Sequence, residues 1–226
     1  MKELLAAKGV ASSFDGTRVL DDVTLSIAQG EPVGLYGPNG SGKTTLANVL
    51  SGLILPDAGS IAFEGRDVTR LPMDARYRLG IARTFQIPHP YPVLTVHEAM
   101  RVALSAAGAG KRAGSAGSGE EIEGLLSRAG LFYQRFVPCA RLSQGCLRRL
   151  EFARSLACGP RLLILDEVFS ALSAADEEDL LALLRSANRE GGTAFLLISH
   201  NLRLLQSACR RILYLEEGRI RRERTV

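Results

Sequence analysis

The sequence predicts an α/β fold in which a mainly parallel sheet flanked by helices is joined to an antiparallel β portion at the N-terminus. From Arg161 onward, apolar runs without alternation are separated by helical stretches, a pattern typical of parallel strands covered on both faces. Near the N-terminus, the runs 4–14 and 19–27 have strand composition and are joined by Asp15-Gly16, a dipeptide typical of hairpin turns.

The elements between these two regions follow from local signals. A short apolar strand over 32–36 stops at Gly37, and a helix over 44–51 ends at Gly52, a residue that suits a helix C-cap. A strand follows at 60–63, and helical composition returns at 72–79, 96–106, 120–129 and 143–157.

One segment of the helical region has a different composition. Residues 107–119 hold five Gly and four Ala but no bulky apolar side chain, which predicts a flexible, exposed loop. We expect a single domain, 1–226, with a helical subdomain over about 88–158 that contains this loop.

The C-terminal part predicts strand, helix, strand and helix in turn, then a hairpin around Gly218 with arms at 212–217 and 219–220. The four elements before the hairpin are expected at 162–165, 176–190, 194–198 and 201–208.

Composition excludes several classes of protein. Of the net charge of +4, a net +3 lies in 210–226, so the body is nearly neutral and broad nucleic-acid binding is not supported. The four cysteines lack C-x-x-C spacing, which argues against a zinc site or a disulfide framework. The chain has no apolar run long enough for a membrane span and no secretory signal, so we expect a cytoplasmic protein.

The strongest local motif is Gly37-Pro38-Asn39-Gly40-Ser41-Gly42-Lys43-Thr44, which matches the phosphate-loop pattern G-x-x-x-x-G-K-[ST]. Its backbone N–H groups and the following helix dipole suit a polyphosphate, Lys43 would reach the β- and γ-phosphates, and Thr44 would ligate Mg²⁺. The alternative is a Gly-rich turn that only caps a helix. The apolar strand before the motif, and the scarcity of lysine in this arginine-rich chain, favour the phosphate site.

Two further strand ends carry polar side chains. The run 162–165 ends in Asp166-Glu167, where one carboxylate could lie beside Mg²⁺ and the other could orient an attacking water. His200 follows the next predicted parallel strand and would lie at the same carboxyl edge, where doubly wound sheets bind ligands. Taken alone, each of these signals is weak evidence for a site. Strands often end in acidic residues, and a histidine after a strand is often only a capping or core residue.

With one further motif, the sequence resembles the ATP-binding cassette (ABC) family. Leu142-Ser143-Gln144-Gly145-Cys146 is similar to the family signature and lies 20 residues before Asp166. Thr84-Phe85-Gln86 is similar to its glutamine loop, and Phe14 stands where an aromatic residue stacks on adenine. The resemblance covers nearly the whole chain and implies a phosphate-loop NTPase core.

The resemblance implies a head-to-tail dimer with two ATP molecules at the interface, and a role for each matching residue. Residues 37–45, including Thr45, would hold the phosphates, while Thr44, Gln86 and Asp166 would hold Mg²⁺. Glu167 would be the general base, His200 would contact the γ-phosphate, and Ser143 and Gly145 would reach the partner's ATP. Transmembrane permease subunits would provide the only membrane contact, on the cytoplasmic face of the inner membrane.

A finer resemblance concerns the transported solute. The run 79–88, with Pro90, Pro92, 94–96 and Glu98 after it, is similar to ATP-binding subunits of branched-chain amino acid and urea importers. Leu71-Pro72-Met73 fits too, although lipopolysaccharide-export ATPases share it. Two rival functions stay open: a soluble ABC ATPase of DNA repair, which would carry coiled-coil insertions not seen here, and a catalytically weak structural subunit.

Four positions depart from the family pattern. Cys146 replaces a glutamine, Val168 a proline, Ser173 an aspartate, and Asn201 an acidic residue. Every residue expected to touch Mg²⁺ or γ-phosphate is retained, so we expect ATP binding to be less affected than the rate of hydrolysis.

Overall fold

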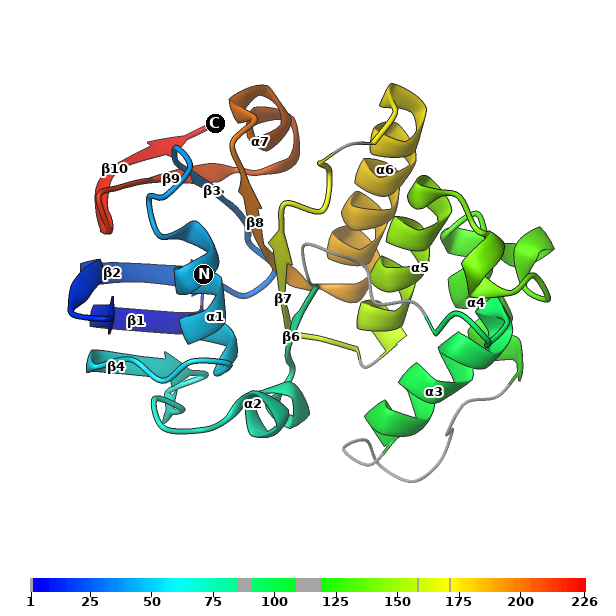
Figure 1. Ribbon diagram of the computed structural model, residues 1–226, viewed down its shortest axis with the longest axis horizontal. Helices are drawn as coiled ribbons and strands as arrows, with labels where there is room; N and C mark the ends of the chain where they lie inside the picture. The colour runs from blue at the N-terminus through cyan, green and yellow to red at the C-terminus, as the bar shows by residue number, and fades with distance from the viewer. Residues whose placement is uncertain (1, 85–90, 109–118, 158, 171) are drawn as a thin grey trace.

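The computed structural model describes residues 2–84, 91–108, 119–157, 159–170 and 172–226 (Figure 1). Most of the predicted flexible loop, together with Phe85 and Gln86, lies outside these residues. Within them the chain forms two sheets and the helices that pack on them, and the predicted α/β class is confirmed.

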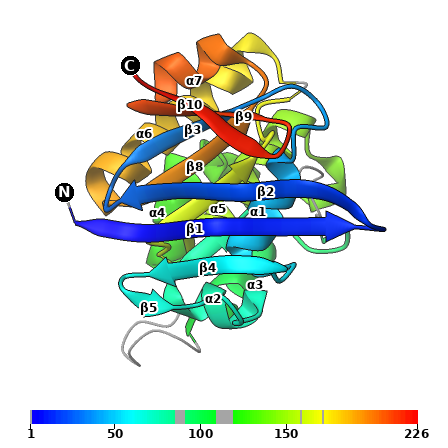
Figure 2. The same ribbon diagram turned by 90° about the vertical axis from the view of Figure 1, so that its left-hand side faces the viewer.

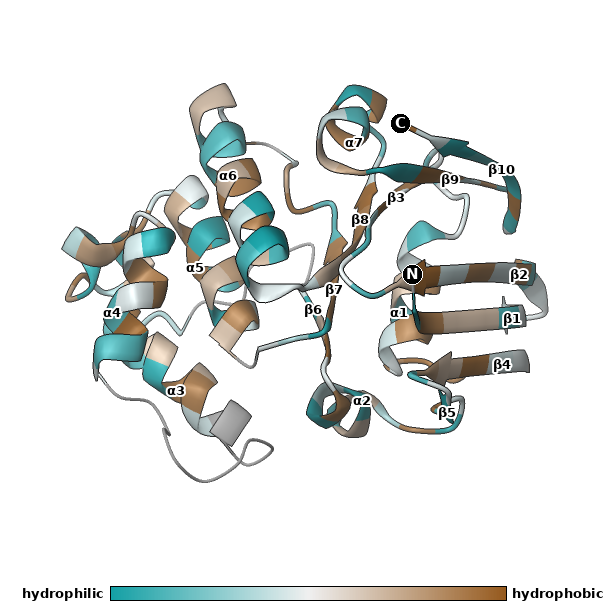
Figure 3. Cartoon of the chain, turned by 180° about the vertical axis from the view of Figure 1, so that it is seen from behind, coloured by the Kyte–Doolittle hydropathy of each residue, from teal (hydrophilic) through white to brown (hydrophobic). Residues whose placement is uncertain are grey.

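The central sheet has the strand order β10-β9-β3-β8-β7-β6. Its strands from β9 to β6 are parallel, whereas β10 is antiparallel to β9. Their bounds are β3 (Pro32–Tyr36), β6 (Ile81–Arg83), β7 (Leu162–Asp166), β8 (Ala194–Ser199), β9 (Arg211–Glu216) and β10 (Arg219–Thr225). Side chains of β7 alternate between two cores, with Leu162 and Ile164 in one and Leu163 and Leu165 in the other. This is why β7 and β8 are unbroken apolar runs in the sequence (Figure 3).

The antiparallel sheet has the order β2-β1-β4-β5 and faces the viewer in Figure 2. Its strands are β1 (Glu3–Phe14), β2 (Thr17–Ala28), β4 (Ala58–Phe63) and β5 (Arg66–Asp67). Asp15 and Gly16 join β1 to β2 with φ of 48° and 77°, as a tight hairpin turn requires. The predicted antiparallel β portion is confirmed.

The helices divide between the two cores. The helix α1 (Lys43–Ser51) lies between the two sheets and packs against α2 (Met73–Leu79) (Figures 1 and 2). The other face of the central sheet is covered by α5 (Gln144–Ala157), α6 (Ala174–Gly191) and α7 (Leu202–Ala208). Beyond α5 lie α3 (Val96–Gly108) and α4 (Gly119–Arg128), and 3₁₀ turns at Phe132–Gln134 and Cys139–Arg141 lead from α4 to α5.

The structure corrects several predicted bounds. Residues 107 and 108 end α3 and Gly119 begins α4, so these three residues are helical rather than part of the predicted loop. The strand β10 continues to Thr225 rather than stopping at Ile220, since an exposed edge strand tolerates arginines. Neither β5 nor β6 was predicted, because two or three residues give no readable period.

Candidate active site

A cavity of about 370 Å³ opens at the carboxyl ends of the central strands. It is lined by the loop between β3 and α1, by the residue after β7 and by the residue after β8. The lining residues are Val19, Asn39, Gly40, Gly42, Lys43, Thr44, Thr45, Glu167, Ser170 and His200. The predicted convergence of the phosphate loop, Glu167 and His200 is therefore present.

The phosphate loop is held by its own backbone. Lys43 is 7% exposed, and its Nζ donates hydrogen bonds to the carbonyl oxygens of Gly37 and Pro38, each at 2.8 Å. A Cβ on Gly37 would lie 2.3 Å from the Leu215 carbonyl oxygen, and one on Gly42, where φ is 99°, would lie 2.9 Å from Leu20 Cδ2. Both positions require glycine for close packing, so the sequence constrains the loop to this path.

Asp166 lies behind the cavity at the end of β7 and is 1% exposed. Its Oδ2 is 3.5 Å from Arg83 Nη2, and neither carboxylate oxygen has a hydrogen bond of normal geometry from a described residue. Burial raises the pKa of Asp166, while Arg83 and the Thr44 hydroxyl act in the opposite direction. A buried carboxylate whose oxygens lack hydrogen-bond donors, beside a hydroxyl, is chemically suited to a divalent cation.

Glu167 follows Asp166 directly and has an unfavourable backbone conformation. Its φ is 51°, in the left-handed region that costs a residue with a side chain about 1 kcal/mol. The carboxylate is 3.1 Å from the backbone N of His200, which donates to Oε1, and Nδ1 of the same histidine is also 3.1 Å from Oε1. Because an ionised carboxylate only accepts, Nδ1 is the donor here, and Oε2 is free of hydrogen bonds from the described residues.

The second group of predicted residues lies on α5, outside the cavity lining. The side chain of Ser143 caps this helix by accepting from the Cys146 N–H at 3.2 Å. Gly145 packs directly on Asp176, since an added Cβ would lie 2.1 Å from Asp176 Oδ1. Ser173 caps α6 by accepting from the Asp176 N–H and donates its own hydroxyl hydrogen to Asp176 Oδ2 at 2.7 Å.

Of the remaining predicted site residues, those that the structure describes do not line the cavity. Phe14 ends β1 and is 42% exposed, and the β-sheet residue that lines the cavity is Val19 of the neighbouring strand. Gln86 lies outside the described residues. Gly37, Pro38 and Ser41 shape the phosphate loop without lining the cavity.

Sequence reasoning missed Arg83, Ser170 and Val19. The signal for Arg83 is a lone arginine that follows two apolar residues directly before Thr84-Phe85-Gln86. A charged side chain in such a position is buried only if it is paired, and Asp166 is its acidic partner.

The sequence matches known proteins over most of its length. A model of the ABC transporter family matches residues 20–170. The chain is 37% identical over 199 residues to a probable ABC transporter ATP-binding protein of Azorhizobium caulinodans, covering 88% of this chain and 69% of that protein. It is 34% identical to the lipopolysaccharide export system ATP-binding protein LptB of Acidithiobacillus ferridurans (97% and 89% covered). It is 36% identical to the sulfate/thiosulfate import ATP-binding protein CysA 2 of Chromobacterium violaceum (97% and 58% covered).

Solved structures support the same assignment to the ABC transporter family. The ADP conformation of MJ1267, an ATP-binding cassette of an ABC transporter, matches with a TM-score of 0.87 and 26% identity over 100% of this chain and 92% of that one. A dimeric cassette, MJ0796 bound to ADP and Pi, matches with a TM-score of 0.86 and 27% identity over 98% of each chain. The chain therefore belongs to the ABC transporter family and is one of its ATP-binding, ATP-hydrolysing subunits.

Proposed function

We propose that the cavity described above binds ATP and that Glu167 is the general base of its hydrolysis. The observation that carries this proposal is the convergence of Lys43, Thr44, Glu167 and His200 on one cavity. The phosphate loop would hold the β- and γ-phosphates through its N–H groups and Lys43. Glu167 Oε2 would accept a proton from the attacking water, because Oε1 is already engaged by His200.

The same arrangement constrains His200. Its Nδ1 hydrogen is directed to Glu167, so a hydrogen bond from Nε2 to a phosphate oxygen needs a second ring proton. Without that proton, the imidazole must release Glu167 to contact the γ-phosphate. We propose that His200 exchanges between the two partners when ATP binds.

Mg²⁺ is the cation that this site fits. The described residues contain no cluster of three His, Cys, Asp or Glu, so a metal here would depend on few protein ligands and on the nucleotide phosphates. Thr44 and Asp166 would hold it, with Gln86 as the third protein ligand. When bound, Mg²⁺ neutralises charge on the β- and γ-phosphates.

The position of the signature segment supports a head-to-tail dimer. Ser143 and Gly145 lie outside the chain's own cavity, so they can contact ATP only if it is bound by a second subunit. The solved MJ0796 cassette is dimeric, which supports the same geometry. The second ATP-binding subunit would be either an identical or a related chain.

Attachment to a membrane would come from permease subunits. Of the helices that the structure describes, none has both the length and the apolar composition of a membrane span. We place this chain at the cytoplasmic face of the membrane, bound to a permease, with residues 88–158 acting as its helical subdomain.

For the solute, we propose import of a branched-chain amino acid or a similar small solute. The support is the resemblance of the run 79–88 and the residues after it to those importers. The specific competitor is lipopolysaccharide export, since LptB is 34% identical over 97% of the chain.

The test replaces the native chain in its host by the Lys43→Ala variant. We expect uptake of labelled leucine, isoleucine and valine to fall to background. Unchanged uptake of all three, with lipopolysaccharide lost from the cell surface, would instead assign the chain to export.

A further inference from the structure

We infer that Arg83 is a positioning residue for the Mg²⁺ site, acting through Asp166. This inference rests on the proposed function, because it assigns a role to a residue behind the proposed metal ligand. Arg83 is the last residue of β6, and its side chain is 3% exposed. A guanidinium buried to this extent is costly unless its N–H groups are paired.

Arg83 joins three elements of the core. Its Nη2 faces Asp166 Oδ2 at the end of β7, at 3.5 Å. Its Nη1 donates to Asn48 Oδ1 at 2.5 Å and to Ser51 Oγ at 3.3 Å, both on α1. Its Nε donates to the Thr84 carbonyl oxygen at 3.4 Å.

Two of these elements, α1 and β7, would deliver metal ligands. The helix α1 begins beside Thr44, one turn before Asn48, and β7 ends at Asp166. One side chain therefore fixes the spacing between the elements that carry the proposed ligands.

The contact with Asp166 also leaves the carboxylate available. At 3.5 Å the pair is electrostatic, and neither Asp166 oxygen has a hydrogen bond of normal geometry from a described residue. Arg83 thus supplies a counter-charge without occupying a metal-binding oxygen. Without that counter-charge, a carboxylate that is 1% exposed would be held less firmly in this place.

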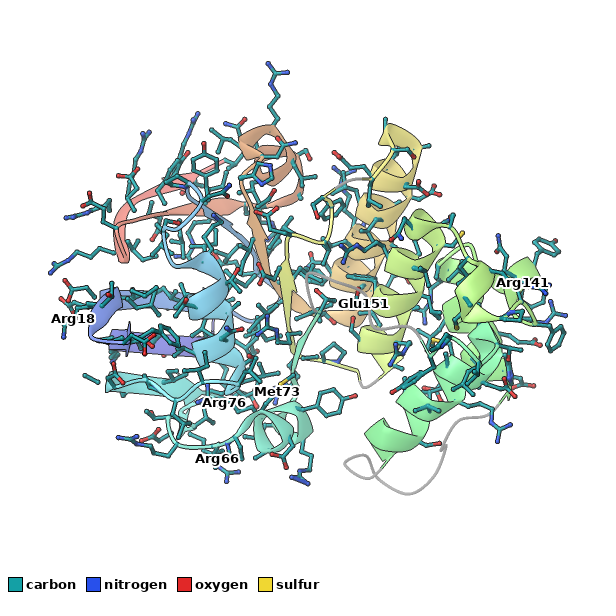
Figure 4. The ribbon with its side chains drawn as sticks, viewed as in Figure 1. Arg18, Arg66, Met73, Arg76, Arg141 and Glu151 are labelled. Carbon is teal, nitrogen blue, oxygen red and sulfur yellow. The ribbon has the colours of Figure 1, made fainter. Side chains whose placement is uncertain are left out.

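Arg76 provides a matched control, because it is a second buried arginine that contacts the helix α1. It is 0% exposed and lies against the C-terminal end of α1, where Nη1 donates to the carbonyl oxygens of Val49 and Leu50 at 2.8 Å (Figure 4). Its hydrogen bonds within the described part of the chain go to backbone carbonyl oxygens and not to a carboxylate. Loss of Arg76 should lower the stability of the fold alone, whereas loss of Arg83 should also weaken Mg²⁺ binding.

The experiment measures binding of a fluorescent ATP analogue to the full chain, in EDTA and over a Mg²⁺ titration. For Arg83→Met we expect affinity in EDTA within about twofold of the native value, and a Mg²⁺ requirement about tenfold higher, as for losses around metal ligands. Arg83→Lys, which keeps the charge, should recover part of the loss. Arg76→Met should lower the melting temperature and leave the Mg²⁺ requirement unchanged.

An unchanged Mg²⁺ requirement in folded Arg83→Met would overturn the inference. If that variant does not fold, Asn48→Ala decides, because it removes the nearer of the two Nη1 acceptors and keeps the arginine. A raised requirement supports the inference and an unchanged one refutes it. The Asp166→Asn variant distinguishes a failure of the inference about Arg83 from a failure of the proposed function. If it too leaves the requirement unchanged, then the assignment of Asp166 to Mg²⁺ is wrong.

Discussion

The cavity region and the signature region of this chain are built in different ways. In the cavity, side chains from separate elements meet: His200 after β8 holds Glu167 after β7, while Lys43 is held by the carbonyl oxygens of its own loop. In the signature region, each of the two serines bonds within one helical turn, since Ser143 caps α5 and Ser173 caps α6, although Arg149 also joins α5 to Asp179 of α6. The first region depends on the tertiary fold, and the second is organised mainly by local capping.

This difference explains which departures from the family pattern the fold accepts. Ser173 and Asn201 each cap a helix through a side-chain oxygen, a role that serine, asparagine and aspartate perform about equally. The substitutions therefore keep the local structure. What they change is the charge that these positions would present to a partner.

The largest expected effect comes from the cavity. Glu167→Gln should lower turnover about 1,000-fold, because an amide cannot accept the proton of water. ATP affinity should stay within about threefold, since the hydrogen bond from the His200 N–H can go to the amide oxygen. Single-turnover hydrolysis and equilibrium binding measure the two effects, with exposed Glu178→Gln as the control. Native turnover in Glu167→Gln would remove Glu167 from the mechanism.

A second variant tests whether the phosphate loop binds ATP. Lys43→Ala should weaken ATP binding about 100-fold, because it removes a buried cation whose charge-assisted hydrogen bonds are worth roughly 1.5 to 3 kcal/mol each. The measurement is titration calorimetry with ATP. The exposed Lys8→Ala should bind like the native chain. Equal affinity for both variants would refute the binding role of Lys43.

A smaller effect is expected in the signature region from Gly145→Ala. The added Cβ would lie 2.3 Å from Asp176 Cγ, so the first turn of α5 must shift. We expect a loss of about 1 to 3 kcal/mol in the free energy of unfolding and a roughly tenfold lower ATPase rate.

Two variants sharpen that test. Asp176→Ala in the same chain should recover part of the lost stability, since it removes the clashing carboxylate. Gly124→Ala on α4, where an added Cβ meets nothing within 4 Å, should stabilise the chain slightly. Destabilisation of equal size by Gly124→Ala would show that the Asp176 contact is unimportant.

The smallest effect concerns Cys146 and Ser173, the two altered residues of the signature region. Cys146→Gln combined with Ser173→Asp should raise the ATPase rate of the homodimer several-fold, by restoring the amide and the carboxylate of the family pattern. For Ser173→Asp alone the melting temperature should barely change, because aspartate also caps α6, whereas Cys146→Gln introduces an amide at a position that is 9% exposed and should lower it. An unchanged rate, with dimers verified under ATP, would mean that the chain is fully competent with its own residues.

Much of the cavity could be predicted from sequence because its motifs occupy strand ends. Asp166, Glu167 and His200 follow neighbouring parallel strands, and such strands bring their carboxyl ends to one edge. The role of Arg83 could not be predicted from sequence. Its pairing with Asp166 depends on β6, a strand of three residues that forms by pairing with β7. The contact between Gly145 and Asp176 likewise joins two helices whose packing no local pattern specifies. Phe14 was expected beside adenine by resemblance alone; it ends β1 and is not among the residues that line the cavity, so its contact with adenine stays a prediction.

Because Glu167 has a left-handed backbone conformation, the residue that would be most stable at position 167 differs from the residue that activity requires. Glycine there would relieve the conformational cost of about 1 kcal/mol and would abolish the carboxylate. A screen that selects only for thermal stability should therefore enrich substitutions at this residue, and they should be inactive. Any programme of stabilisation for this chain has to hold position 167 fixed and look for its gains elsewhere.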